Sequence, residues 1–300
     1  MQVFVTGASG FIGAAVVTQL LDAGHHVVAL ARSPQSAERL TAQRADVHPG
    51  DLDDPDSLRA AAKAADGVIH LAFQHGEPYD QAAGADRRAI AAIGDVLAGS
   101  GRPFVVTSGT LLLAPGRVGT EADPPDPASP GAARAGAEQT ALALADRGVR
   151  VSVVRLAPSV HDQVRRGFVG ALIDTAERTG ISAYVGDGSQ RWPTVHRQDA
   201  ARLFRLAMDS APAGSVLHAV GEDGVRLRAI AEFIGGRLGI PVRSVPADQA
   251  EAHFGRLSSV VGTDAPASSI ATRRLLGWQP SGPGLLDDLA HGRFFTEAQR

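Results

Sequence analysis

The chain opens on the sequence Val3-Phe4-Val5-Thr6-Gly7-Ala8-Ser9-Gly10-Phe11-Ile12-Gly13, and this stretch decides the fold. An apolar run typical of a strand leads into three glycines spaced three residues apart, and an apolar helical pattern follows. We expect Gly7 to make a tight turn, Gly10 to let the main chain approach a phosphate, and Gly13 to let helix and strand pack closely. Free N–H groups at the start of the helix favour a pyrophosphate there. The stretch therefore predicts a dinucleotide site, and a merely structural turn is the alternative.

Strand and helix patterns alternate on both sides of this turn. Short β-branched runs are followed by longer helical patterns, which indicates βαβ units and a parallel sheet. The predicted strands cover residues 3–6, 27–31, 47–49, 67–71, 104–107 and 151–156. The predicted helices cover residues 10–23, 37–43, 55–64, 82–97 and 132–146. This order predicts an α/β fold with a Rossmann-type, doubly wound parallel sheet.

The pattern loosens after residue 156, and we divide the chain at that point. Residues 1–156 are predicted to form the Rossmann domain that binds the dinucleotide. Residues 157–300 are predicted to form a smaller mixed α/β substrate lobe at the C-terminal ends of the strands, where doubly wound folds bind ligands. Part of that lobe, about residues 195–220, is expected to pack back on the Rossmann core. Residues 114–131 are rich in proline, which predicts an irregular surface segment or lid.

Composition excludes several classes of protein. The net charge is −3 with no basic block, so neither nucleic acid nor a membrane surface is an expected partner. The chain has no cysteine, which excludes disulfides and thiolate metal sites, and its scattered histidines predict no metal site. No apolar run approaches the ~18 residues of a membrane span, and no signal peptide precedes the first strand. We therefore expect a cytoplasmic protein with a small-molecule partner, and the oligomeric state stays open.

The end of the second predicted strand bears on which dinucleotide is bound. A site selective for NAD usually places an acidic residue there to hold the ribose 2′-OH. This chain has Arg32, followed by Ser33. A guanidinium can hold a 2′-phosphate through two hydrogen bonds, and a serine hydroxyl can add a third. NADPH is therefore the predicted cofactor, with NADH as a possibility; a solvated surface arginine is the alternative interpretation.

Two further strand ends offer contacts to the cofactor. Asp51 and Leu52 follow the third strand, where a carboxylate can accept a hydrogen bond from an adenine amino group. Asp51 can equally cap the helix expected from residue 55. Ala72 follows the fourth strand and is small enough to let the cofactor lie close.

In their order along the chain, these motifs resemble the short-chain dehydrogenase/reductase superfamily, in its extended or atypical epimerase-like branch. The matching segments extend over nearly the whole chain and comprise residues 6–13, 51–52, 70–72, 106–108, 155–160 and 195–200. The resemblance implies NAD(P)(H) chemistry, in which a hydride passes between the nicotinamide C4 and a hydroxyl or carbonyl carbon. Together with the strand ends above, it gives the expected cofactor contacts Gly7, Ser9, Gly10, Phe11, Ile12, Gly13, Arg32, Ser33, Asp51, Leu52, Ala72, Thr107, Arg134, Pro158, Ser159 and Val160.

The same resemblance implies positions at the other end of the cofactor. Pro158, Ser159 and Val160 are expected along the nicotinamide, and Trp192 and His196 near the substrate. A simple turn at Pro158 and a structural hydrogen bond at His196 are the alternatives.

The catalytic pair of that superfamily is missing from this chain. Its members use a Ser/Thr together with Tyr-x-x-x-Lys, in which the tyrosine protonates the carbonyl and the lysine lowers the tyrosine pKa. Neither Tyr79 nor Tyr184 is followed by a lysine four residues later. With Glu138 aligned to the glutamate that commonly follows the motif, Pro130 stands at the tyrosine position and Arg134 at the lysine position.

Two hydroxyls remain near the missing Ser/Thr. Gly109 takes that position, and Ser108 and Thr110 flank it. Either is a candidate donor to a developing alkoxide, with capping of backbone groups as the alternative. Arg134 is expected to hold the ribose, or else to be an exposed helix charge.

These features predict an NADPH-dependent ketoreductase acting on a bulky, aromatic, polyketide-like ketone without the usual tyrosine. Binding in a fixed geometry supplies as much as ~7–11 kcal/mol of barrier lowering, whereas general acid catalysis adds roughly 10²–10⁴-fold. A cleft lined by aromatic side chains is expected around Trp192 and His196, with Phe168, Phe254 and Trp278, although core packing is the alternative for each. A non-catalytic NADP(H) sensor is the second hypothesis, and an epimerase or dehydratase, which depends on the missing tyrosine, is the third.

Overall fold

The parallel sheet predicted from the N-terminal half is present. A computed structural model describes residues 1–295, and in it seven strands pair in the order β10-β6-β5-β4-β1-β2-β3, every neighbouring pair being parallel. The strands are β1 (Gln2–Thr6), β2 (His26–Ala31), β3 (Asp46–Pro49), β4 (Gly67–His70), β5 (Pro103–Gly109), β6 (Arg150–Leu156) and β10 (Ser215–Ala219). The order reverses between β1 and β4, which is where a doubly wound sheet opens its ligand crevice.

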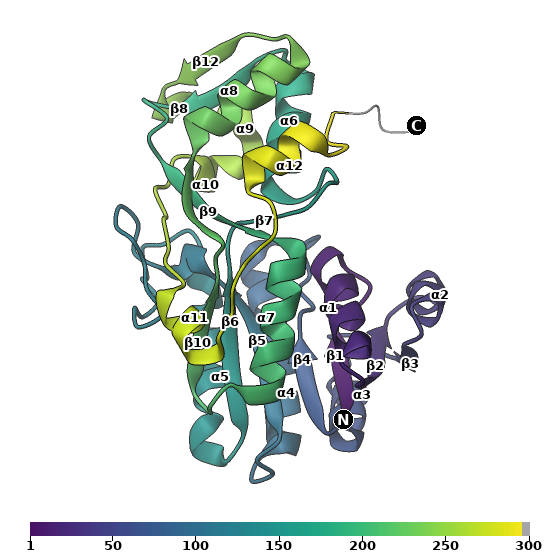
Figure 1. Cartoon of the computed structure of the whole chain (residues 1–300). Helices are drawn as coiled ribbons and strands as arrows, with labels where there is room; N and C mark the ends of the chain where they lie inside the picture. Colours follow the sequence, from purple (N-terminus) through teal and green to yellow (C-terminus); the bar gives the residue numbers. More distant parts are fainter. Residues whose placement is uncertain (296–300) are drawn as a thin grey trace.

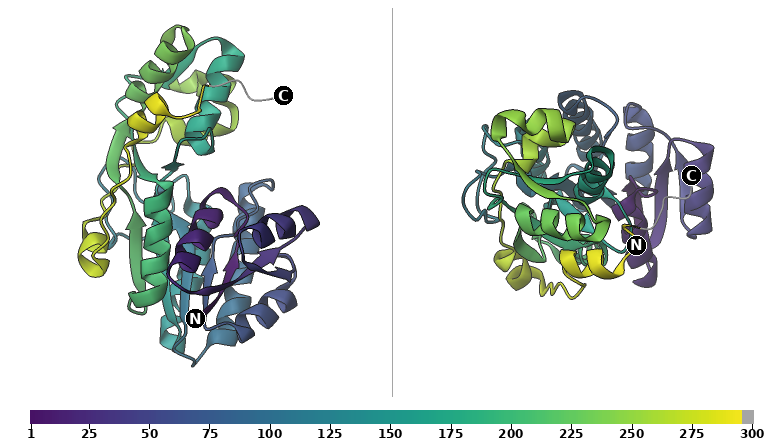
Figure 2. Two further views of the ribbon diagram at one scale, coloured as in Figure 1. Left: turned by 45° about the vertical axis from the view of Figure 1, so that its right-hand side comes forward. Right: turned by 90° about the horizontal axis from the view of Figure 1, so that it is seen from above.

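Helices cover both faces of this sheet (Figures 1 and 2). One face carries α1 (Phe11–Asp22) and α7 (Arg197–Ser210), which pack against each other. The other face carries α3 (Pro55–Ala64), α4 (Tyr79–Leu97) and α5 (Ala135–Leu142), whereas α2 (Pro34–Ala42) lies by the β2–β3 edge. Side chains alternate between the two resulting cores: Val3 and Val5 enter one, and Phe4 enters the other. Burial on both faces explains why the strands read as continuous apolar runs.

A smaller lobe lies beyond the carboxyl ends of the strands, at the top of Figure 1. It contains a three-stranded sheet of β11 (Glu222–Arg226), β9 (Arg191–His196) and β7 (Ser159–His161), and a parallel pair of β8 (Ser182–Val185) with β12 (Val242–Val245). The accompanying helices are α6 (Gly167–Thr179), α8 (Leu227–Leu238), α9 (Ala250–Phe254), α10 (Ser258–Val261) and α12 (Leu285–His291). A third apolar core fills this lobe.

The chain passes between the two parts more than once. After β9 it returns along α7 and β10, and β10 adds an edge strand beside β6. After α10 it returns again to form α11 (Ile270–Leu276) near β10 before ending in the lobe. The last five residues of the range predicted for the lobe lie outside the described residues. In residues 1–295 no helix is both long and apolar enough to cross a membrane.

Hydrogen bonds join the proline-rich segment 114–131 to neighbouring parts of the chain. The Gly116 amide donates to the carbonyl of Asp264 over 2.7 Å. Gly119 exchanges main-chain hydrogen bonds with residues 266 and 268, of 2.9 and 2.8 Å. Arg155 additionally donates to the Asp123 carbonyl over 2.9 Å. Opening of this segment would break these bonds, and its interpretation as a lid stays a prediction.

Candidate cofactor and substrate site

The glycine turn has the geometry that its spacing predicts. Gly7 has φ of +69°, and a Cβ added to it would lie 2.6 Å from the Ala72 amide nitrogen. A Cβ at Gly13 would lie 2.1 Å from the Gly7 carbonyl oxygen. Any side chain at these two positions would therefore collide with main chain, which cannot move aside cheaply. The turn brings the end of β1, the start of α1 and the end of β4 into contact.

The start of α1 is open to an anion. Gly10 is the N-cap residue, no side chain caps the helix, and its first turn holds no acidic residue. The first N–H groups of a helix have no partner within the helix, so they and the positive end of the dipole attract phosphate. Ser9, Phe11 and Ile12 flank this point and are not fully buried. The cradle thus fits the pyrophosphate of a dinucleotide.

Arg32 is the free polar group at the end of β2. Within residues 1–295 its exposed guanidinium makes no hydrogen bond or ion pair. The Ser33 hydroxyl, in contrast, caps α2 by accepting from the Ser36 amide over 3.2 Å. The Ser33 side chain is therefore engaged by the helix, and Arg32 remains as the group that fits a 2′-phosphate.

The residues that follow β3 and β4 differ in which of their groups remain available to a cofactor. Asp51 accepts from the Asp53 amide over 3.1 Å, and Leu52 is buried. Asp54, not Asp51, caps α3 by accepting from the amides of residues 56 and 57. Capping is therefore the wrong interpretation of Asp51. Ala72 packs against the turn through its main chain, as described for Gly7.

A buried polar chain connects the glycine turn to α4. Thr6 Oγ1 and His70 Nδ1 are 2.8 Å apart, and His70 Nε2 and Asp86 Oδ1 are 3.0 Å apart. Thr6 Oγ1 also accepts from the Ala72 amide over 3.2 Å, and because the Asp86 carboxylate can only accept, His70 carries a proton on Nε2. His70 then donates through Nε2 to the Asp86 carboxylate. Neither His70 nor Asp86 was predicted as a site residue, although a histidine that ends an apolar strand and an aspartate on an apolar helix face are both visible in the sequence.

Arg134 joins this chain at its far end. Its Nη2 donates to Asp86 Oδ2 over 3.0 Å and to the Thr107 carbonyl over 2.8 Å, and its Cζ lies 4.5 Å from the centre of the Phe73 ring. Burial alone raises the pKa of Asp86, but the hydrogen bonds and charges of His70 and Arg134 outweigh it and hold the pKa below its ordinary value. Arg134 is therefore not an exposed helix charge.

Thr107 has a structural hydrogen bond as well. Its hydroxyl donates to the His70 carbonyl over 2.7 Å, across the β4–β5 pair. The same threonine thus holds Arg134 through its carbonyl and β4 through its side chain, so its side chain is committed within the protein.

A second buried pair holds α5 against β6. Arg155 donates to Glu138 through Nε and Nη2, over 3.1 and 2.5 Å, and both side chains are almost fully buried. Glu138 aligns with the glutamate that commonly follows the Tyr-x-x-x-Lys motif. Its contact fixes the helix that begins just after Arg134, and so fixes the direction from which Arg134 reaches the crevice.

The hydroxyls predicted to contact a substrate carbonyl are closed off. Ser108 and Thr110 are 3% and 1% exposed, and neither hydroxyl has a hydrogen-bond partner. The main-chain capping considered as the alternative is absent too. Both hydroxyls are therefore unpaired and enclosed, and their role as carbonyl donors stays a prediction.

The residues expected near the nicotinamide and substrate are either partly or fully buried. Ser159 is buried with an unpartnered hydroxyl, while Val160 is only partly buried and packs on the Rossmann core next to Pro158. Trp192 is fully buried in the core of the lobe, where its indole donates to the Val260 carbonyl over 3.3 Å. Trp192 is thus a core residue, which corrects its assignment to the substrate.

His196 is also structural. It precedes α7 and caps it by accepting from the Gln198 amide over 3.3 Å. Trp278 and Phe254 are buried in the cores, and Phe168 packs on Trp192 with ring centres 5.7 Å apart. The expected aromatic cleft is therefore not formed by these side chains. The aromatic rings at the crevice come from the segment after β4, which the sequence analysis did not single out.

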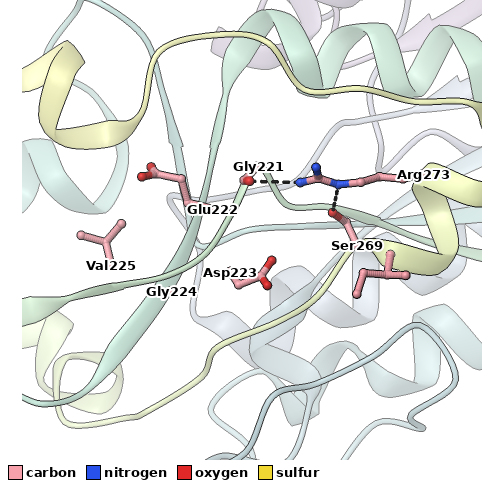
Figure 3. A pocket seen from close by; sticks show the side chains of 8 residues that line it. Gly221, Glu222, Asp223, Gly224, Val225, Ser269 and Arg273 are labelled. Atoms are coloured by element: carbon pink, nitrogen blue, oxygen red, sulfur yellow. Dashed lines mark hydrogen bonds between the residues drawn. The ribbon is translucent and has the colours of Figure 1, made fainter.

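A separate cavity of about 470 Å³ lies between β11 and α11 (Figure 3). Arg273 donates there to the Gly221 carbonyl over 3.1 Å and to Ser269 Oγ over 2.9 Å. Burial raises the pKa of Asp223, which also lines it. The remaining lining residues are Glu222, Gly224, Val225 and Ile270. None of the predicted site residues borders this cavity. No group of three or more His, Asp or Glu side chains in the described part of the chain is placed to hold a metal ion.

Comparison with known proteins identifies the family of this chain. The family model described as NAD dependent epimerase/dehydratase family matches residues 3–219. An uncharacterized protein of Schizosaccharomyces pombe is 47% identical over 298 residues, which are 98% of this chain and 100% of that protein. The chain therefore belongs to the NAD-dependent epimerase/dehydratase family. It is an oxidoreductase or a related enzyme with a Rossmann-type fold.

Two further relatives are informative. A 4-hydroxy-2-methyl-3-oxo-4-farnesyl-3,4-dihydroquinoline-1-oxide ketoreductase of Stigmatella aurantiaca is 28% identical over 280 residues, which are 85% of this chain and 80% of that protein. Among solved structures, MoeE5 in complex with UDP-glucose and NAD has a TM-score of 0.74 and 25% identity, with 97% of this chain and 96% of that chain covered.

Proposed function

We propose that this protein is an NADPH-dependent ketoreductase that reduces the carbonyl of a bulky, aromatic, polyketide-like ketone. The single observation that carries the choice of cofactor is Arg32, exposed and unpaired within residues 1–295 at the end of β2. An acidic residue there would hold the ribose 2′-OH of NAD, whereas a guanidinium suits a 2′-phosphate. The ketoreductase activity that the name of the Stigmatella relative states supports the choice of reaction.

Some residues of this chain bind the phosphates of the cofactor, and another places a positive charge near the reacting carbonyl. When bound, the reduced nicotinamide supplies a hydride to the carbonyl carbon of the substrate. The open amides at the start of α1 hold the pyrophosphate, and Arg32 holds the 2′-phosphate. Arg134, fixed by Asp86 and the Thr107 carbonyl, places a positive charge beside the crevice, where it stabilises a developing negative charge.

The absence of a tyrosine at position 130 disfavours an epimerase, because that reaction depends on a tyrosine base. Pro130 occupies the position, and the neighbouring Ser129 hydroxyl is buried without a partner. A non-catalytic NADP(H) sensor fits the glycine turn equally well and makes one different prediction, which is tight binding without turnover.

Titration calorimetry with NADPH and NADH, followed by spectrophotometric oxidation of NADPH with a panel of aromatic ketones, tests this proposal. We expect NADPH to bind more tightly than NADH, and at least one aromatic ketone to be reduced faster than a small aliphatic ketone. Tight NADPH binding with no turnover on any ketone would favour the sensor. Stronger binding of NADH would contradict the role of Arg32.

A further inference from the structure

Three aromatic rings lie beside Arg134 on the segment that links β4 to α4. The ring centre of Phe73 is 5.1 Å from that of His75 and 5.9 Å from that of Tyr79. Arg134 lies over the Phe73 ring at 4.5 Å. Because β4 is next to β1 at the point where the strand order reverses, this segment borders the ligand crevice. The four side chains therefore form one cluster at the edge of this crevice, where we expect the substrate to bind.

The geometry of α4 aligns Tyr79 with the buried carboxylate of the network. Tyr79 is the first residue of the helix, and Asp86 follows seven residues later. Seven residues make nearly two turns, so both side chains lie on one face of the helix, about 10.5 Å apart along its axis. Asp86 faces His70 and Arg134. Tyr79 consequently projects from the same face, two turns nearer the carboxyl edge of the sheet.

Tyr79 is also reachable, unlike the hydroxyls first considered. It is 44% exposed, whereas Ser108 and Thr110 are 3% and 1% exposed. Its hydroxyl makes no hydrogen bond within residues 1–295, so its proton is free for a ligand. Tyr184, the other tyrosine of the chain, lies on β8 in the small lobe beside Arg228.

We propose that Tyr79 is the proton donor to the substrate carbonyl and that Arg134 supports it, so that a tyrosine and a cation from separate helices replace the missing Tyr-x-x-x-Lys pair. This inference rests on the proposed function. The carbonyl carbon gains the hydride, the C=O π electrons move to oxygen, and that oxygen takes the proton from Tyr79 Oη. The products are the alcohol, the oxidised cofactor and a tyrosinate, which water reprotonates. The Arg134 charge stabilises the tyrosinate in the interval.

The groups around Tyr79 shift its pKa in opposing directions. Burial raises its pKa, the Arg134 charge lowers it, and the carboxylates of Asp86 and Asp80 raise it, with a net upward shift. Tyr79 thus carries its proton at neutral pH, and the Arg134 charge is the influence among these that favours its release. His75 is the other titratable group of the cluster, and burial together with the Arg134 charge lowers its pKa, so it stays neutral.

Tyr79→Phe is the decisive variant, because it removes the proton and keeps the ring, and Tyr184→Phe is its matched control. We expect Tyr79→Phe to lower kcat by roughly 10²–10⁴-fold, the usual contribution of general acid catalysis, with the affinity for NADPH unchanged. Tyr184→Phe should leave kcat unchanged. Normal turnover in Tyr79→Phe overturns the donor role. If Tyr79→Phe turns over normally and Tyr79→Leu has a raised KM, the Tyr79 ring serves only as a surface on which the substrate stacks.

A second measurement does not depend on activity. Ultraviolet titration of tyrosinate in the ligand-free Tyr184→Phe protein follows Tyr79 alone. Replacing Arg134 by leucine should raise the pKa of Tyr79, and Arg134→Lys should largely restore it. An unchanged Tyr79 pKa in Arg134→Leu overturns the support by Arg134. If the wild type reduces no ketone, the proposed function and the donor role both fail, whereas loss of the donor role alone appears as normal turnover in Tyr79→Phe.

Discussion

Removal of the Asp86 carboxylate tests the buried network that fixes Arg134. Asp86 is 1% exposed and contacts both His70 and Arg134 at 3.0 Å. Asp86→Ala leaves the Arg134 cation, whose side chain is only 15% exposed, without its counter-charge. Breaking a buried ion pair by removing one partner costs about 3–5 kcal/mol. Because Arg134 retains some contact with solvent, we expect the lower end, about 3 kcal/mol.

Thermal unfolding measures this loss. In a chain of this size each kcal/mol shifts Tm by about 2 °C, so Asp86→Ala should lower Tm by about 6 °C. Asp86→Asn keeps the shape and loses the charge, and its Tm should lie between those of Asp86→Ala and the wild type.

A double-mutant cycle with Arg134→Ala separates the pair from its surroundings. If the two side chains interact as described, the double variant should lose less stability than the sum of the single variants, by at least about 0.5 kcal/mol. Additive losses, or an Asp86→Ala protein that unfolds at the wild-type Tm, would refute the reasoning.

Three further outcomes follow from single groups. Arg32→Ala should weaken NADPH binding by about 10- to 100-fold and leave NADH binding unchanged, because it removes one to two charge-assisted hydrogen bonds at an exposed site. Arg39→Ala on α2 is the control. Equal losses of affinity for both coenzymes would contradict the assignment of Arg32 to the 2′-phosphate. Gly13→Ala should abolish cofactor binding in calorimetry, because its Cβ would lie 2.1 Å from the Gly7 oxygen, whereas Gly236→Ala, which has nothing within 4 Å, should bind normally. Burial lowers the pKa of His161 below 6.5, despite the opposing effect of Asp288. The folded protein should therefore lose stability as the pH falls below 6.5, because the buried ring then has to take up a proton. When unfolding is measured against pH, this loss should be shallower in His161→Asn.

The sequence was sufficient for the parts of the fold that depend on local pattern. The glycine turn, the first six strands and the helices between them follow from period and from main-chain sterics at Gly7 and Gly13.

The rest of the site depends on contacts between distant segments. Asp86 and Arg134 are 48 residues apart, and Arg155 and Glu138 pair across a strand and a helix, so no local pattern brings them together. Trp192 and His196 were placed by resemblance near the substrate, yet burial in the lobe core and capping of α7 use both side chains. Ser108 and Thr110 show the same limit, because the burial of a hydroxyl at a strand end depends on tertiary packing and not on local pattern.

The central claim is that main-chain amides at the start of α1 hold the phosphates of a nicotinamide dinucleotide, with Arg32 selecting the phosphorylated form. Titration calorimetry of the purified protein with NADPH and with NADH tests it most directly. The account predicts saturable one-site binding of both coenzymes, with NADPH the tighter. No measurable heat with either coenzyme, confirmed by an unchanged Tm at saturating NADPH, would contradict it.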